Sequence, residues 1–382
     1  MPWKKTPPMT ERLNFIALYQ SRLWTTTELC TRFGISRKTG DKWLGRYRQE
    51  GLSGLQEKPR LPRHCPHRIA PEIAAVLLAA KRRHPNGGPR KIFPYGARHH
   101  PALTWPAASS LGALFRNAGL SRPKQRRRRP HHPGAPALHT GSPNEVWTAD
   151  FKGQFRPGDG LYCYPLTVAA AYWRYLLGCS ARLSTKQVEA QPIFERLCRE
   201  YGLPGAIRTD HGAPFATPAF CGLSQLSVWW IKLGIRHQRI EPGRPEQSGR
   251  QERMHRTLKA EATRPPERNQ PAQQARFDRV CQKYNHERPH EALGQRPPAA
   301  LYRPAPRRMP AKIAEPAYPG HYFVRRVSNA GAFRFTSRQL FLSDTLLQEQ
   351  IALEETGDGL WSIYFYDVLL ARLDERDFTL RG

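Results

Sequence analysis

The sequence has no long apolar segment. Its longest apolar run, Ile73 to Ala80, stops far short of the roughly 20 residues that a membrane-spanning helix needs. The first residues carry no apolar stretch of the kind found in a secretory signal. The 7 cysteines are odd in number and form no C-x-x-C pair, which argues against a disulfide framework and against a zinc ribbon. We therefore expect a reduced, cytoplasmic protein with no membrane segment.

Acidic residues are also scarce, because 31 Asp and Glu stand against 61 Lys and Arg, a formal net charge of +30. Residues 1–140 hold 27 of the basic and 6 of the acidic residues, whereas residues 306–382 hold 10 of each. This uneven distribution favours a polyanion bound mainly by the N-terminal third, since Lys and Arg displace counterions from phosphates. The alternatives are a solvated basic face and a membrane surface. No basic amphipathic helix with an aromatic apolar face supports the membrane alternative.

Residues 9–50 have the pattern of a helix-turn-helix unit. Gly34 ends one helix, and Ser36 is a typical N-cap for a second helix over Arg37–Glu50. In DNA-binding units of this kind the second helix enters the major groove. A plain helical hairpin would use the same glycine turn, and the local positive charge favours the DNA interpretation. The side chains expected to contact DNA are Arg37, Lys38, Lys42 and Arg46.

The chain divides into four predicted domains. The helix-turn-helix domain covers residues 1–60, and residues 61–140 form a second helical DNA-binding unit followed by a basic linker. That linker contains Arg126, Arg127, Arg128 and Arg129, which would lie along phosphates or be solvated. Residues 141–305 alternate strands and helices in the order βββαβαβα, a mixed α/β layer. Residues 306–382 predict six short strands, which we expect to form a small β-barrel.

Three carboxylates stand out in the α/β region. Asp150 lies in its first predicted strand, Asp210 follows a short strand, and Glu252 lies on a long helix. Three such groups in one place repel one another unless a cation lies between them. Oxygen ligands without a Cys or His set favour Mg²⁺, with Mn²⁺ as a plausible substitute. Two such ions would suit a phosphoryl displacement by water or by a DNA 3′-hydroxyl.

With these three carboxylates and the stretches around them, the sequence resembles the insertion-sequence transposases of the DDE superfamily, which share their catalytic core with retroviral integrases. The resemblance also includes Met1–Lys4 and the helix-turn-helix region, so it covers nearly the whole chain. It implies a ribonuclease-H-like core, metal-dependent nicking and strand transfer, and binding to the element's terminal inverted repeats. Four ordered stretches carry it, namely Asn144–Gly153, Ile207–Phe215, Glu241–Lys259 and Tyr284–Gly294.

The resemblance also implies how the protein works with DNA. Its partner would be double-stranded DNA, both the element ends and the target. Because transposition joins two ends, we expect a homo-oligomer on DNA. The location would be the bacterial cytosol, in association with the nucleoid.

The third carboxylate requires a choice between Glu246 and Glu252, which follow Asp210 by 36 and 42 positions. We choose Glu252, because the stretch from Ser248 to Glu252 fits the family's pattern of a small polar residue, glycine, two residues and the acidic ligand. The same helix adds three cations near the predicted site, although i,i+4 ion pairing within the helix is an alternative reason for them. These cations are Arg253, Arg256 and Lys259.

Two positions depart from the family pattern, which usually has asparagine where this chain has His211 and Ser248. Changes beside metal ligands commonly lower metal affinity or activity about 10- to 100-fold. The alternative function is therefore a catalytically decayed transposase that binds or represses the element ends without cutting. A third interpretation, a nuclease for RNA–DNA hybrids, fits poorly with a helix-turn-helix unit, because A-form duplexes offer no readable major groove.

Overall fold

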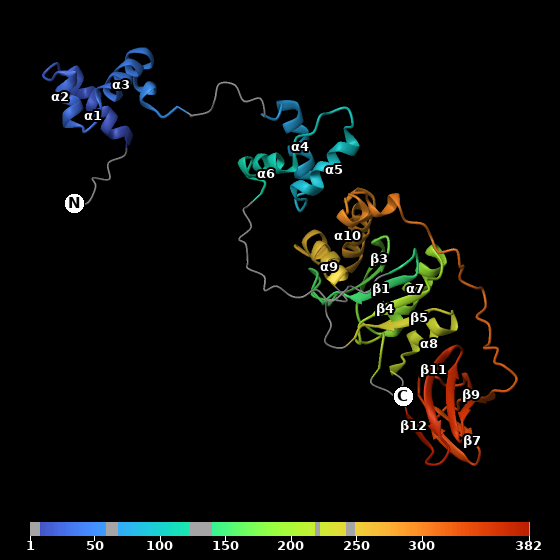
Figure 1. Ribbon diagram of the computed structural model, residues 1–382. Helices are drawn as coiled ribbons and strands as arrows, with labels where there is room; N and C mark the ends of the chain where they lie inside the picture. Colours follow the sequence, from blue (N-terminus) through green and yellow to red (C-terminus); the bar gives the residue numbers. More distant parts are fainter. Residues whose placement is uncertain (1–7, 59–67, 122–139, 218–221, 242–248, 382) are drawn as a thin grey trace. The chain divides into compact units, whose positions relative to one another are not determined.

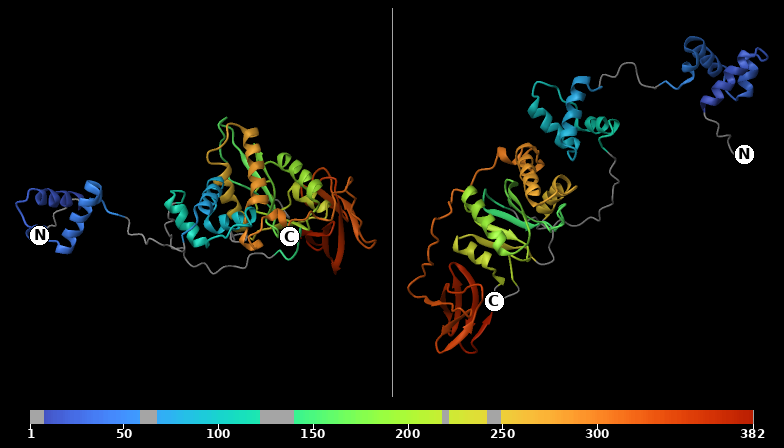
Figure 2. Two further views of the ribbon diagram at one scale, coloured as in Figure 1. Left: turned by 90° about the horizontal axis from the view of Figure 1, so that it is seen from above. Right: turned by 180° about the vertical axis from the view of Figure 1, so that it is seen from behind.

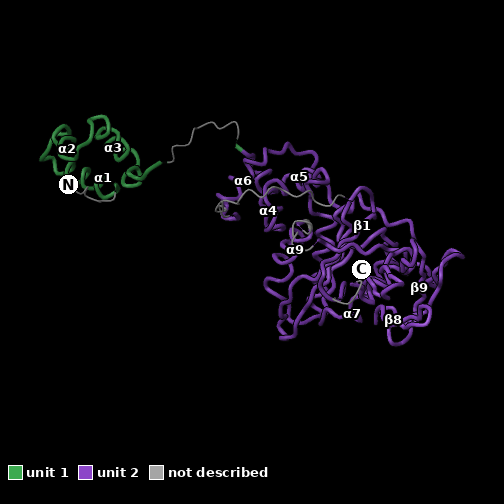
Figure 3. Tube along the Cα trace, turned by 60° about the horizontal axis from the view of Figure 1, so that its bottom comes forward, with its two compact units in different colours: residues 1–68 green, residues 69–382 purple. Residues whose placement is uncertain are grey.

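The structure is a computed structural model that describes residues 8–58, 68–121, 140–217, 222–241 and 249–381. The chain forms two compact units, residues 1–68 and residues 69–382 (Figure 3). The predicted contact residues Arg126–Arg129 and the alternative ligand Glu246 lie outside the described residues, as does Ser248.

The first unit is the predicted helix-turn-helix. Its helices are α1 (Pro8–Gln20), α2 (Thr26–Arg32) and α3 (Arg37–Glu50), and a 3₁₀ turn follows at Gly51–Leu55. Local capping sets the boundaries. Thr25 and Glu28 form a capping box at the start of α2, and the Ser36 side chain accepts a hydrogen bond from the Thr39 N–H at the start of α3. The three helices enclose a buried cluster that includes Phe15, Leu29 and Trp43.

Gly40 allows α3 to approach the other two helices closely. A Cβ added there would lie 2.5 Å from Cys30 Sγ and 3.2 Å from Phe15 Cζ, whereas nothing lies within 4 Å of a Cβ at Gly45. We expect Gly40→Ala to destabilise this unit by about 1–3 kcal/mol, as overpacking does. Gly45→Ala is the matched control and should stabilise the helix by about 0.5–1 kcal/mol. Thermal unfolding of the full chain measures both, and equal effects of the two changes would contradict the packing argument.

Residues 71–120 are helical, as predicted, but contain one helix more than expected. The helices are α4 (Pro71–Arg83), α5 (Pro89–His99) and α6 (Ala108–Asn117). The sequence analysis missed α5 because Pro94 lies inside it, and proline ordinarily breaks a helix interior. Tertiary packing overrides that preference, since Ile92 and Tyr95 of α5 are buried against Leu77, Leu111 and Phe115.

The central region contains the predicted sequence of elements. Its five-stranded sheet has the order β3-β2-β1-β4-β5, with β4 parallel to both β1 and β5, and with β2 antiparallel to both β1 and β3. The order βββαβαβα is confirmed, and a further helix, α10, follows it. The elements are β1 (Val146–Phe151), β2 (Tyr164–Ala170), β3 (Tyr175–Arg182), α7 (Gln187–Tyr201), β4 (Ala206–Thr209), α8 (Gln225–Lys232), β5 (Arg236–Arg239), α9 (Gly249–Ala262) and α10 (Gln270–Gln282).

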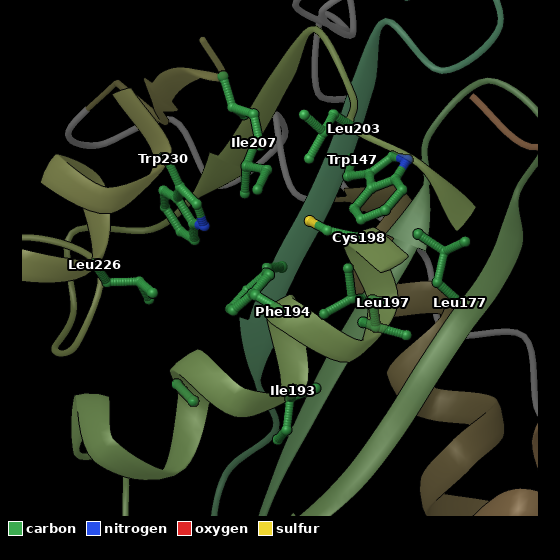
Figure 4. Close-up of a cluster of buried hydrophobic side chains, with 14 of the residues drawn as sticks. Trp147, Leu177, Ile193, Phe194, Leu197, Cys198, Leu203, Ile207, Leu226 and Trp230 are labelled. Carbon is green, nitrogen blue, oxygen red and sulfur yellow. The ribbon is translucent and has the colours of Figure 1, made fainter. Parts of the chain in front are cut away.

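Helices cover both faces of this sheet (Figures 1 and 2). On one face, Phe194 and Leu197 of α7 and Trp230 of α8 pack against Trp147 and Ile207 of the strands, and Figure 4 shows these side chains converging. A second buried cluster holds α9 and α10 against the strands, with members that include Leu176, Cys179, Leu258 and Phe277. Neighbouring residues of β3, such as Leu176 and Leu177, belong to different clusters because successive strand residues face opposite sides.

Side-chain amides from the C-terminal part of this region complete the edge strand β3. Asn285 accepts a hydrogen bond from the Leu176 N–H and donates one to the Leu176 carbonyl, each at 2.9 Å. Gln274 of α10 accepts from the Ala181 N–H at 2.7 Å and donates to the Cys179 carbonyl at 3.0 Å. These contacts satisfy backbone groups that an open sheet edge would leave unpaired.

The C-terminal region is all β, but the predicted barrel is not what the structure has. One sheet has the order β12-β11-β10-β9-β6, and β7 and β8 form a separate two-stranded sheet. Among the described residues, the short end strands β6 and β12 each pair on one side only, so the sheet does not close as a barrel requires. The strands are β6 (Phe323–Arg326), β7 (Ala332–Phe335), β8 (Arg338–Phe341), β9 (Gln350–Gly357), β10 (Leu360–Phe365), β11 (Val368–Asp374) and β12 (Thr379–Arg381).

Across the described part of the chain, no helix combines the length and the apolar character that crossing a membrane requires.

Candidate active site

The register of the sheet brings Asp150 and Asp210 to the same level. Strands β1 and β4 are parallel neighbours, and their last paired residues are Thr148 and Arg208. Asp150 and Asp210 each lie two positions beyond that pair. Side chains two residues apart share a face of a strand, and adjacent strands lie about 4.8 Å apart. The two carboxylates therefore lie near the C-terminal ends of two adjacent strands, close enough for the charge of Asp210 to act on Asp150.

Glu252 lies in the first turn of α9, exposed to solvent. Its negative charge acts on Asp150. Burial raises the pKa of Asp150 from 3.8 to about 7; the negative charge of Asp210 adds to this rise, and that of Glu252 adds a smaller part. The positive charge of Lys152 opposes the rise. We call Asp150, Asp210 and Glu252 the carboxylate triad.

The three side chains of the triad do not form a compact metal-binding site in this structure. Within the described ranges, no three His, Cys, Asp or Glu side chains lie close enough to hold a metal ion. The donor chemistry nevertheless suits a hard divalent cation, since all three groups offer carboxylate oxygens. Burial is the largest cause of the raised pKa of Asp150, and the repulsion by Asp210 and Glu252 that adds to it is of the kind that such a cation relieves.

The buried residue His255 connects α9 to the aspartate strands. Its Nδ1 lies 3.6 Å from Asp150 Oδ2, and its Nε2 lies 2.8 Å from Thr167 Oγ1. Burial, followed by the charge of Lys152, lowers the pKa of His255 to about 4, so the ring is neutral at physiological pH. The sequence analysis did not select His255. Its position one helical turn after Glu252 was the available signal.

Basic side chains lie beside the triad. The three cations predicted to contact phosphates, Arg253, Arg256 and Lys259, are all exposed on α9. The sequence analysis missed Lys152, two residues after Asp150. Burial and then the charge of Lys259 lower the pKa of Lys152, so these two ammonium groups share one electrostatic environment beside the triad.

The last of the four recognised stretches, Tyr284–Gly294, supports helix α9. Arg288 donates hydrogen bonds to Glu261 Oε1 at 3.3 Å and to Thr257 Oγ1 at 3.1 Å, both on α9. Asn285 of the same stretch bonds the backbone of β3, as described above. This stretch therefore ties α9 to the sheet edge, and its role in the structure is support.

On the first unit, the predicted DNA-contacting residues lie along α3. Arg37, Lys38 and Lys42 are exposed, and Arg46 is half-buried. The Arg46 guanidinium lies 5.1 Å from the centre of the Trp43 ring, and the Lys42 ammonium lies 4.8 Å from it. Trp43 thus orients two cations of the helix, an effect that adds to its role in the core.

The raised pKa of Asp150 predicts a pH-dependent stability in the absence of metal. Because the folded state holds this proton more tightly than the unfolded chain, the stabilising contribution is complete below about pH 4 and is lost as pH rises through about 7. Asp150→Asn cannot ionise and should escape that loss. We expect its advantage in the free energy of unfolding to grow by about 1.4 kcal/mol per pH unit across this window.

Urea unfolding in a chelator at pH 5, 6 and 7 measures this difference. Asp159→Asn serves as the control, because Asp159 is exposed on a loop of the same region. Parallel stability curves for Asp150→Asn and the parent protein would refute the electrostatic account.

Comparisons with known proteins identify two kinds of domain in this chain. Residues 141–245 and 233–298 each match an integrase core domain family. Residues 11–63 match a helix-turn-helix domain, and residues 39–109 match a homeodomain-like domain. The chain therefore carries a helix-turn-helix domain and an integrase core domain.

Two relatives illustrate the range of similarity. An uncharacterized 39.2 kDa protein of the insertion element IS476 from Xanthomonas euvesicatoria is 25% identical over 277 residues, which are 71% of this chain and 76% of that protein. The Gag-Pol polyprotein of baboon endogenous virus (strain M7) is 30% identical over 149 residues, 39% of this chain but 8% of the polyprotein. The predicted resemblance to insertion-sequence transposases with an integrase-like core of the DDE type is confirmed.

Two of the solved structures that match this chain come from viruses. The HTLV-2 integrase catalytic core domain in complex with magnesium (trimeric form) is 13% identical, with a TM-score of 0.35 over 43% of this chain and 99% of that one. A simian T-cell lymphotropic virus intasome in complex with PP2A regulatory subunit B56 gamma is 16% identical, with a TM-score of 0.39 over 72% of this chain and 97% of that one.

Proposed function

We propose that this chain is a transposase that binds the terminal inverted repeats of its insertion sequence and catalyses metal-dependent nicking and strand transfer of DNA. The observation that carries the proposal is the carboxylate triad. Asp150 near the end of β1 and Asp210 just after β4 lie at equivalent positions in the parallel register, and burial together with the charges of Asp210 and Glu252 raises the pKa of Asp150. An enzyme that moves phosphoryl groups needs such a concentration of negative charge to hold cations.

Asp150, Asp210 and Glu252 would hold divalent cations, Mg²⁺ or Mn²⁺. These ions supply charge stabilisation for the attacking and leaving oxygens of the displacement. The exposed cations of α9, with Lys152 beside Asp150, would bind the phosphates on either side of the reacting bond. Ionised Asp150 is the form that binds metal, so metal binding should displace the proton that this carboxyl holds as pH rises toward about 7.

DNA binding would involve two segments of the chain. Arg37, Lys38 and Lys42 of α3 would enter the major groove of a terminal repeat, because they are exposed on the second helix of the helix-turn-helix. The sequence Arg126–Arg129 would add phosphate contacts. Because two element ends are joined to a target, the active form would be a homo-oligomer on DNA in the bacterial cytosol.

A strand-transfer assay with the full chain tests the proposal. The substrate is a duplex that carries the element end, incubated with a circular target in Mg²⁺ or in a chelator. We expect nicked and joined products with Mg²⁺ and none with the chelator. Normal DNA binding without any metal-dependent product would instead support the decayed, end-binding protein that the departures at His211 and Ser248 suggest.

A further inference from the structure

Each aspartate of the triad has a threonine hydroxyl on its main-chain carbonyl. Thr167 Oγ1 donates to the Asp150 carbonyl at 3.0 Å, and Thr209 Oγ1 donates to the Asp210 carbonyl at 2.9 Å. Both threonines are buried, at 0% and 1% exposure. Buried hydrogen bonds of this kind are not exchanged with water, so they restrain the backbone from which each carboxylate projects.

Each of these hydroxyls also forms a hydrogen bond with a histidine ring. His255 Nε2 is 2.8 Å from Thr167 Oγ1, and His237 Nε2 is 2.8 Å from Thr209 Oγ1. A hydroxyl has one proton, and here the Asp150 or Asp210 carbonyl receives it. Each threonine oxygen must therefore accept the Nε2–H of its histidine, which fixes the tautomer of both rings.

The fixed tautomer has a consequence at Asp150. With its proton on Nε2, His255 presents an unprotonated Nδ1 toward Asp150 Oδ2, 3.6 Å away. It therefore does not donate a hydrogen bond to the carboxylate and does not compete with a cation for it. The ring acts on Asp150 by holding Thr167 and by packing α9 against the strands.

The two arrangements come from different elements. Thr167 is on β2 and His255 is on α9, one helical turn after Glu252. Thr209 is the last residue of β4, and His237 is on the neighbouring strand β5. The same side-chain pair thus occurs twice, once for each aspartate, with no shared residue.

We propose that Thr167–His255 and Thr209–His237 are two positioning pairs that hold Asp150 and Asp210 in the alignment needed to share divalent cations. This inference rests on the proposed function, because it assigns a purpose to the same triad. The pairs do not contact substrate themselves. They act through the main chain of the two aspartates, and the Thr167–His255 pair also fixes α9, which carries Glu252.

The test replaces each hydroxyl by a methyl group of the same size. Thr167→Val and Thr209→Val in the full chain should reduce strand transfer about 10- to 100-fold and weaken Mn²⁺ binding by a similar factor. Thr167→Ser and Thr209→Ser keep the hydroxyl and should restore both to within about threefold, well inside that range. Mn²⁺ binding, followed by electron paramagnetic resonance without DNA, is a readout that does not depend on activity.

Thr148→Val is the matched control. Thr148 lies on β1, and its hydroxyl donates to the Ala169 carbonyl at 3.3 Å, so the change removes a similar bond that serves no aspartate. It should leave Mn²⁺ binding unchanged, and its melting temperature shows what the loss of a strand hydrogen bond does by itself. Equal Mn²⁺ binding by folded Thr167→Val, Thr209→Val and Thr148→Val would overturn the proposal.

The outcomes also separate this inference from the proposed function. If the parent protein binds Mn²⁺ in a manner that depends on Thr167 and Thr209 but joins no DNA, the proposed function fails and the positioning pairs stand. If the parent binds Mn²⁺ and joins DNA equally well with valine at both positions, the proposed function stands and the positioning pairs fail. A parent that binds no Mn²⁺ overturns both.

Discussion

Asp210→Asn is expected to reduce metal-dependent strand transfer about 1,000-fold, while binding to the element end stays unchanged. The amide keeps the shape of the side chain and can still accept the hydrogen bond that the Gly212 N–H now donates to Asp210 Oδ1 at 3.1 Å. It lacks the charge that holds a cation. Metal ions contribute several kcal/mol of charge stabilisation to such reactions, and each 1.4 kcal/mol corresponds to about a factor of 10 in rate.

The measurement pairs a strand-transfer assay with a gel shift on the same DNA. Glu252→Gln should lose activity to a similar degree, and Glu246→Gln should retain it, because Glu252 is the chosen third ligand. Joining by Asp210→Asn at the rate of the parent protein would remove the triad from the mechanism. Loss of activity in Glu246→Gln with full activity in Glu252→Gln would assign the third ligand to the other glutamate.

The second large effect concerns DNA affinity. We expect the affinity of the full chain for duplex DNA to fall at least about 1,000-fold between roughly 50 and 200 mM salt, as for proteins that neutralise six or more phosphates. Replacing Arg37, Lys38 and Lys42 together by alanine should reduce the slope of log affinity against log salt by about 3, nearly one for each phosphate contact. All three side chains are exposed, so the helix should remain folded.

The control removes the same charge elsewhere. Arg326, Arg334 and Arg372 are exposed on the C-terminal strands, in a region of no net charge. Their replacement by alanine should leave the salt slope within about one of the parent value, because no phosphate contact is predicted there. If both triple variants reduce the slope equally, the affinity comes from net charge, and the helix-turn-helix does not read DNA as proposed.

Much of the secondary structure could be predicted because local rules govern it. Thr25, Glu28 and Ser36 are caps whose effect extends over a few residues, and the helices of the first unit begin where those caps place them. Helix α5 could not be predicted, since Pro94 forbids it locally and burial of Ile92 and Tyr95 favours it from a distance. The sequence also did not predict that the C-terminal sheet stays open. The spacing of strands along a sequence indicates the strands but does not show whether the sheet closes into a barrel.

The candidate site could likewise be predicted only in part from the sequence. Asp150, Asp210 and Glu252 could be selected because each lies in a recognisable stretch of sequence. The partners that surround them could not, because Thr167 and His255 are 88 positions apart and Thr209 and His237 are 28 apart. Only strand pairing and helix packing bring such residues within hydrogen-bond distance, and no local pattern encodes that distance.

By itself, then, the sequence determined the excess of positive charge at one end and the helix-turn-helix, and it selected three carboxylates as the predicted site. These follow from composition, capping and motifs that act over short stretches of chain. The tertiary structure alone decided that Asp150 and Asp210 share a level in the sheet, that burial raises the pKa of Asp150 to about 7, and that His255 supports it. Register, desolvation and packing depend on residues distant in sequence, and only the folded chain brings those residues together.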